Sequence, residues 1–158
     1  MTNVWPVSKM SGLAAVRRVV TGLGEDGRSR VLIDGPSPTV IWRSFEAPVD
    51  NGGSVDTGAA QFSFAMPTGG TQMLSFDIAP THGEMVAPGM HASDTLDYLV
   101  LTAGELVLVT DEGELPLQAG DVIVNRGVMH GWRNDGDVPA RLLIVVVDAL
   151  PVGAGATV

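Results

Sequence analysis

Residues 120–134, GDVIVNRGVMHGWRN, contain the pattern that decides the fold of this chain. A Gly-Asp turn precedes the short apolar run 122–125, and Gly127 separates that run from a second one at 128–133, which contains His130. Short apolar runs bounded by glycine and aspartate are typical of strands joined by tight turns. The segment therefore predicts two short strands, with a histidine on the second.

The same pattern continues on both sides of this segment. Strands are expected at 96–102, 105–110 and 140–148, and each of them is bounded by glycine- or aspartate-containing turns. A strand roughly every ten residues predicts an all-β sandwich or closed barrel. The run at 140–148 is apolar on both faces, which indicates a central strand or an outer face covered by a second subunit. We therefore expect a homodimer.

The first half of the chain is less regular. Strands are expected at 15–20, 28–34, 60–67 and 71–80. The glycine- and aspartate-rich segment 48–60 predicts a surface loop or, alternatively, a lid.

We expect a single domain, because 158 residues suit one hydrophobic core. Residues 1–60 would form a β extension with its loop, residues 61–150 the barrel core, and residues 151–158 a flexible tail.

The composition excludes several classes of function. The chain has 9 basic and 18 acidic residues, a net charge of -9, which argues against nucleic-acid and anionic-membrane partners. It has no cysteine, so disulfides and thiolate metal ligands are excluded. The first ten residues lack a signal-peptide pattern, and no apolar run approaches the ~20 residues that span a bilayer. We expect a cytoplasmic protein.

Residues 85–134 resemble the two motifs of the cupin superfamily. The first motif is a glycine, five residues, His-x-His, three or four residues, a glutamate, six residues and a glycine. Here His91, Ser93, Asp97 and Gly104 occupy its last four positions with the family's spacing. A serine thus stands at the second histidine, and an aspartate at the glutamate.

The second motif is a glycine, five residues, Pro-x-Gly, two residues, a histidine, three residues and an asparagine. Gly120, Gly127, His130 and Asn134 match it, although the loop is one residue short and Asn125 replaces the proline. The resemblance covers the second half of the chain. It implies a small double-stranded β-helix, or jelly-roll, barrel that is often dimeric and binds a divalent metal inside.

Carried over to this sequence, the resemblance makes His91, Asp97 and His130 the metal ligands. Alternate residues of a strand share a face, so two imidazoles and a carboxylate would converge if both strands face one cavity. That set suits iron, manganese, nickel or zinc. The alternative is a metal-free pocket in which the same residues are catalytic, because imidazole transfers protons near neutral pH.

Other residues are candidates for contact with a small organic ligand. Ser93 and Trp132 share a face with the two histidines, Tyr98 flanks the motif, and Arg43 could hold a carboxylate bidentately. Core packing is the alternative for Tyr98, and a surface ion pair is the alternative for Arg43. A further pair, His82 and Glu84, would either complete a metal site or lie in a solvated loop.

Two functions follow from these residues. The first is an enzyme that acts on a small organic substrate inside the barrel, as an isomerase, lyase or dioxygenase, by metal-assisted or His/Asp acid–base chemistry. The alternative is a non-catalytic cupin that binds or senses a small ligand without metal. Fold alone does not choose between them.

Overall fold

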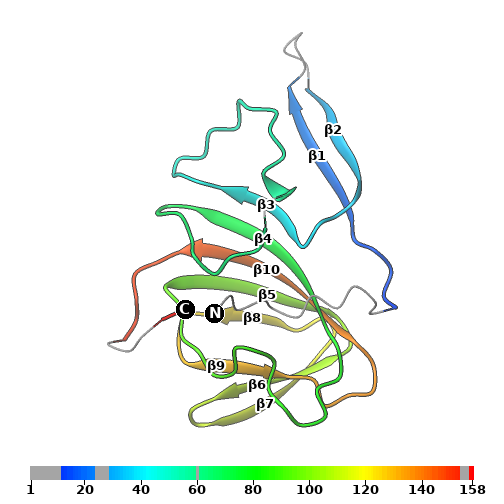
Figure 1. The fold of residues 1–158 in the computed structure, drawn as a ribbon, viewed down its shortest axis with the longest axis vertical. Helices are drawn as coiled ribbons and strands as arrows, with labels where there is room; N and C mark the ends of the chain where they lie inside the picture. The colour runs from blue at the N-terminus through cyan, green and yellow to red at the C-terminus, as the bar shows by residue number, and fades with distance from the viewer. Residues whose placement is uncertain (1–11, 24–28, 60, 154–156) are drawn as a thin grey trace.

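The computed structural model describes residues 12–23, 29–59, 61–153 and 157–158 of the chain (Figure 1). The regular elements are the strands β1 (Arg17–Leu23), β2 (Ser29–Pro36), β3 (Val40–Ser44), β4 (Thr71–Ile78), β5 (Thr95–Ala103), β6 (Glu105–Thr110), β7 (Gly113–Gln118), β8 (Val122–Asn125), β9 (His130–Arg133) and β10 (Ala140–Asp148), and the 3-10 turn η1 (Thr57–Ala59). Within those ranges, no helix has the length and apolar character needed to cross a membrane.

Two antiparallel sheets form the barrel. One has the strand order β3-β4-β10-β5-β8 and the other the order β7-β6-β9. The apolar side chains between them form one core, which includes Leu74, Phe76, Leu101, Leu106 and Leu142. Burial of these alternating side chains from both sheets drives the two layers together. The prediction of an all-β jelly-roll barrel is confirmed.

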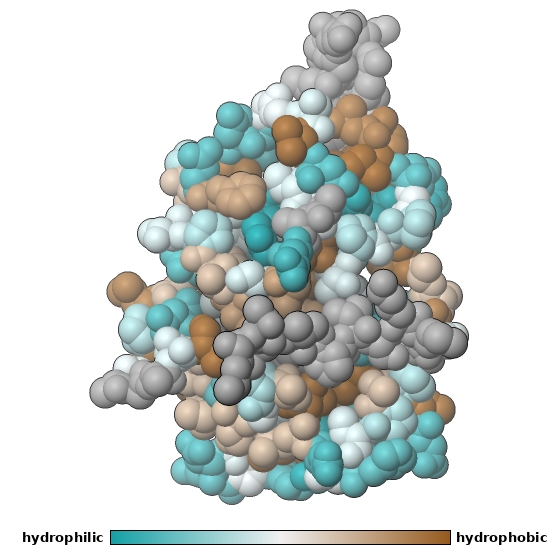
Figure 2. All heavy atoms as spheres, in the orientation of Figure 1, coloured by the Kyte–Doolittle hydropathy of each residue, from teal (hydrophilic) through white to brown (hydrophobic). Residues whose placement is uncertain are grey.

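The strands β1 and β2 pair with each other in a separate two-stranded sheet. This hairpin stands away from the two barrel sheets, at the top of Figure 1, and forms the β extension expected from the sequence. It leaves Val19, Val31 and Leu32 exposed. Figure 2 shows hydrophobic atoms gathered over this part of the molecule.

The apolar strand β10 is central in its sheet. It pairs with β4 on one side and with β5 on the other. Leu142 and Val146 point into the core, whereas Leu143 and Val145 lie half-buried on the opposite face. The central position accounts for the two apolar faces, and the homodimer stays a prediction.

The strand expected at 60–67 is not formed in its described part, residues 61–67. The next strand, β4, offers it no free edge, because both edges of β4 are already paired with β3 and β10. The alternating Phe62, Phe64 and Met66 nevertheless pack against the core. The alternation therefore reflects burial of a loop and not strand pairing.

The loop at 48–59 is tied to the extension by a buried arginine. Arg18 of β1 donates to both carboxylate oxygens of Asp56, at 2.8 and 2.6 Å, and to the carbonyl of Ile41 at 2.9 Å. This anchors the loop close to η1 and favours the surface-loop interpretation over a free lid.

Candidate functional site

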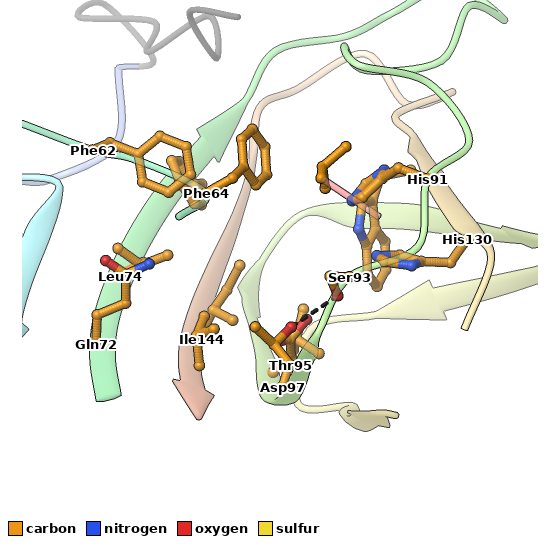
Figure 3. Close-up of a pocket in the computed structure, with 15 residues that line it drawn as sticks. Phe62, Phe64, Gln72, Leu74, His91, Ser93, Thr95, Asp97, His130 and Ile144 are labelled. Atoms are coloured by element: carbon orange, nitrogen blue, oxygen red, sulfur yellow. Dashed lines mark hydrogen bonds between the residues drawn. The ribbon is translucent and has the colours of Figure 1, made fainter. Parts of the chain in front are cut away.

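A cavity of about 70 Å³ opens between the two sheets (Figure 3). Since one water needs about 10–15 Å³ of such space, the cavity has room for a small organic molecule. Its apolar wall includes Phe62, Phe64, Leu74, Phe76, Ile144 and Val146. Its polar wall consists of Gln72, His91, Ser93, Thr95, Asp97 and His130. Apolar walls with a few polar groups are typical of sites for small organic ligands.

The two histidines meet because their backbones pair. His91 precedes β5 and His130 begins β9, and each donates its amide N–H to the other's carbonyl at 2.9 Å. Directly opposite residues of an antiparallel pair point to the same face. The two imidazole rings consequently lie with their centroids 4.4 Å apart at the cavity wall.

Each imidazole is held by a backbone carbonyl two residues before it. Nδ1 of His91 lies 2.9 Å from the carbonyl oxygen of Gly89, and Nδ1 of His130 lies 2.8 Å from that of Val128. A carbonyl only accepts hydrogen bonds, so in the neutral rings these contacts place the proton on Nδ1. The lone pair of each ring is then on Nε2.

The pKa of His130 is lowered to about 4, chiefly by burial and also by the nearby His91, against the backbone hydrogen bonds to Val128 and His91, which raise it. His130 is therefore neutral at pH 7. Adjacent imidazoles do not readily carry two positive charges, because like charges disfavour each other's ionisation. At most one ring of the pair is therefore readily protonated at a time.

Asp97 lies on β5 and faces the same cavity. Burial raises the pKa of its carboxyl, while hydrogen bonds from Thr95 and Asn125 and the proximity of His91 act in the opposite direction. The amide of Asn125 lies 3.4 Å from Oδ2 of Asp97 and 3.2 Å from both ring nitrogens of His130. Asn125 thus links the carboxyl to His130.

The aromatic wall packs edge-on against the imidazoles. Trp132 is buried, and its ring centroid lies 5.8 Å from that of His130, at 79° to it. Phe64 contacts His91 in a similar way at 6.1 Å. These rings keep water from one side of each histidine, which accounts for the burial that lowers the pKa of His130.

The geometry agrees with the comparisons to known proteins. A family model described as the cupin domain matches residues 77–146, which contain β5 to β9 and both histidines. Residues 77–146 of the barrel are a cupin domain. The cupin-domain-containing oxidoreductase virC of Hypocrea virens is 32% identical over 120 residues, which are 72% of this chain and 59% of that protein. The cupin-domain-containing oxidoreductase srdB of Neurospora crassa is 32% identical over 80% of this chain and 64% of its own length.

The chain thus covers less than two thirds of each of these two relatives. Among solved structures, a Cupin 2 conserved barrel domain protein from Salinispora arenicola is 26% identical. The structural match covers 50% of this chain and 64% of the Salinispora chain, with a TM-score of 0.43.

The residues of this cupin barrel do not complete the metal site that the motif resemblance implies. In the described ranges, no group of three or more histidine, aspartate or glutamate side chains is arranged to hold a metal ion. At the motif's second-histidine position, Ser93 instead shares a 2.8 Å hydrogen bond with the hydroxyl of Thr95. Two imidazoles without a third close protein ligand do not fit a resident metal.

Four further predicted residues lie outside the cavity wall. Tyr98 is on the outer face of β5 and is 46% exposed, because its parity is opposite to that of Asp97. His82 and Glu84 are exposed in and beside a turn, as the solvated-loop alternative expects. Arg43 does not line the cavity and contacts Gln72, which does.

Sequence reasoning missed several residues of the cavity wall. Gln72 shares the inward register of Leu74 and Phe76 on β4, so parity alone could have placed it inside. Val158 also lines the cavity, and its amide donates to the carbonyl of Ala92 at 3.0 Å. The flexible tail over 151–158 stays a prediction, and no local sequence pattern indicates this contact of Val158.

Proposed function

We propose that this cupin is an enzyme that binds a small organic molecule in the cavity and transfers a proton to or from it. The observation that carries the proposal is the imidazole pair of His91 and His130, 4.4 Å apart and held at Nδ1 by backbone carbonyls. Such a pair has its basic nitrogens at Nε2, that of His130 lying 3.2 Å from the Asn125 amide, and one ring can accept a proton while its neighbour stays neutral.

The surroundings of the pair support this chemistry. The apolar wall excludes water, which strengthens every electrostatic interaction with a bound molecule. The Asp97 carboxyl, whose pKa burial raises, can hold a proton closer to neutral pH than an exposed carboxyl does. We assign proton abstraction to the imidazole pair and proton return to the same pair or to Asp97. An isomerisation next to a carbonyl group is a reaction that needs only these steps.

The test follows exchange of the α-hydrogens of cyclopentanone, a small ketone, in D₂O by ¹H NMR. The wild type is expected to accelerate the exchange, and His130→Gln and His91→Gln are expected to lose most of that acceleration, about 10²-fold or more. Asp137→Asn, at an exposed site, is the control. Acceleration that persists in both histidine variants would exclude the pair as the catalyst.

A redox reaction is the second candidate function. It is supported by virC and srdB, both of which are named oxidoreductases. Elemental analysis of protein purified without added metal separates the two candidates, with His130→Ala measured in parallel. Near-stoichiometric metal that disappears in the variant would favour the redox candidate and contradict the metal-free one.

We also propose a homodimer. The outer face at the β5–β8 edge is apolar and exposed, with the cross-strand pairs Tyr98–Val124 and Val100–Val122. Apolar patches of this kind favour association. Light scattering after gel filtration should give twice the chain mass, and Val124→Glu should reduce it to one chain mass.

A further inference from the structure

We propose that Gln72, oriented by Arg43, selects the substrate by donating a hydrogen bond to an oxygen acceptor on it. This inference rests on the proposed function, since it assigns a substrate class to the same cavity. The substrate would be a small molecule with an apolar body and a carbonyl oxygen. Arg43 would act as a positioning residue that does not touch the substrate.

The position of Gln72 is the first observation. Gln72 lies on β4 in the inward register, is 3% exposed and lines the cavity between apolar neighbours. In Figure 3 its amide lies on one side of the cavity, beside Leu74, and the two histidines lie on the other. A bound molecule that reaches the histidines can therefore present its far end to Gln72.

The contact with Arg43 is the second observation. Arg43 lies directly across from Gln72 on β3, and its Nε and one terminal nitrogen donate to Oε1 of Gln72 at 3.2 and 2.6 Å. A guanidinium has donors only, so it must face the amide oxygen and not the amide nitrogen. The orientation of this glutamine is therefore determined by its partner.

With Oε1 turned to Arg43, the Nε2 donor is left for the cavity. Nε2 reaches the carbonyl of Ser63 at 3.4 Å, which is long for a hydrogen bond, and it has a second N–H. A buried donor that is incompletely paired favours a ligand with an acceptor, because its desolvation is otherwise uncompensated. A neutral carbonyl suits this donor better than a carboxylate, since the Asp97 carboxyl faces the same cavity.

Two ligands of the same shape test the inference: cyclopentanone, and methylenecyclopentane, in which a CH₂ group replaces the oxygen. Binding of both is measured by ligand-observed NMR with the folded full chain. The wild type should bind the ketone about fivefold more tightly than the alkene, which is the effect of one hydrogen bond. Gln72→Glu should remove this preference, because its carboxylate oxygens accept hydrogen bonds and do not donate them. Its binding of the alkene should stay unchanged.

Variants of Arg43 keep the test decisive if Gln72→Glu fails to fold. Arg43→Met frees the Gln72 amide to rotate, so the affinity for the ketone should approach that for the alkene. Arg43→Lys retains a donor to Oε1 of Gln72 and should keep the preference for the ketone. If the role of Arg43 were purely structural, Arg43→Met would weaken the binding of the ketone and of the alkene by the same factor.

The outcomes separate this inference from the proposed function. Equal binding of ketone and alkene by the wild type would overturn the role of Gln72, while occupancy of the cavity would stand. No binding of either ligand would overturn both. A ketone preference without any α-hydrogen exchange would support the role of Gln72 and contradict proton transfer.

Discussion

His91 and His130 pair through their backbones and place their rings with centroids 4.4 Å apart, although they lie 39 positions apart in the chain. The ring contact follows from the backbone contact, because opposed residues of an antiparallel bridge place their side chains on the same face. A displacement of the backbone at either position would therefore move both rings.

The first prediction concerns acid. The unfolded state protonates His130 near its ordinary pKa of 6.5, and the folded state near 4. Between these values the unfolded state binds more protons, so stability falls as the pH drops from 6.5 toward 4. The loss should reach up to about 3 kcal/mol by urea unfolding. His130→Gln should flatten this part of the profile, and an unchanged slope would refute the assignment.

The second prediction concerns Asp97, whose carboxyl pKa is raised mainly by burial. A raised carboxyl pKa means that the folded state disfavours the charged form, so ionisation at pH 7 costs stability. Asp97→Asn should raise the thermal midpoint at pH 7, and the gain should shrink as the pH falls and the wild-type carboxyl becomes protonated. Asp137→Asn, at an exposed position, should change little. A lowered midpoint for Asp97→Asn would contradict the prediction.

The third prediction concerns the close approach of Gly127 to the segment after His91. Its φ is +73°, and an added Cβ would collide with the carbonyl oxygen of Ser93 and lie 2.9 Å from that of Thr95. Gly127→Ala should cost roughly 3 kcal/mol or more in chemical unfolding, through both strain and collision. Gly83→Ala has the same kind of φ but open space, and should cost only about 1–2 kcal/mol. If the two variants lost the same free energy of unfolding, the collision of the added Cβ at position 127 would be relieved by local movement.

The fourth prediction compares two neighbouring arginines of β1. Arg18 is 8% exposed and pairs with Asp56, whereas Arg17 pairs with Asp34 in the open, with side chains 71% and 47% exposed. Arg18→Met should cost about 2 kcal/mol and make the loop at 48–59 cleavable by thermolysin. Arg17→Met should cost less than about 1 kcal/mol and leave the loop resistant. Similar cleavage in both variants would argue against the anchoring role of Arg18.

Much of the barrel could be predicted from local pattern. Glycine and aspartate turns mark the ends of β5 to β10, and parity explains why Asp97 faces the cavity while Tyr98 does not. The strand expected at 60–67 fails because alternation reports which side chains are buried and says nothing about a free sheet edge.

The site could be predicted less completely. The motif resemblance brought His91 and His130 together, but a linear spacing does not specify how far Asp97 stands from them across the sheet. The carbonyl contacts at Nδ1 and the Arg43–Gln72 pair depend on cross-strand register, which single-strand patterns do not contain.

The contact of Val158 with Ala92 has a practical consequence. Because Val158 forms part of the cavity wall, an affinity tag or linker joined after it would begin at the cavity. Binding and exchange measurements should use protein purified without such an addition, or they would report on the tag as well as on the pocket.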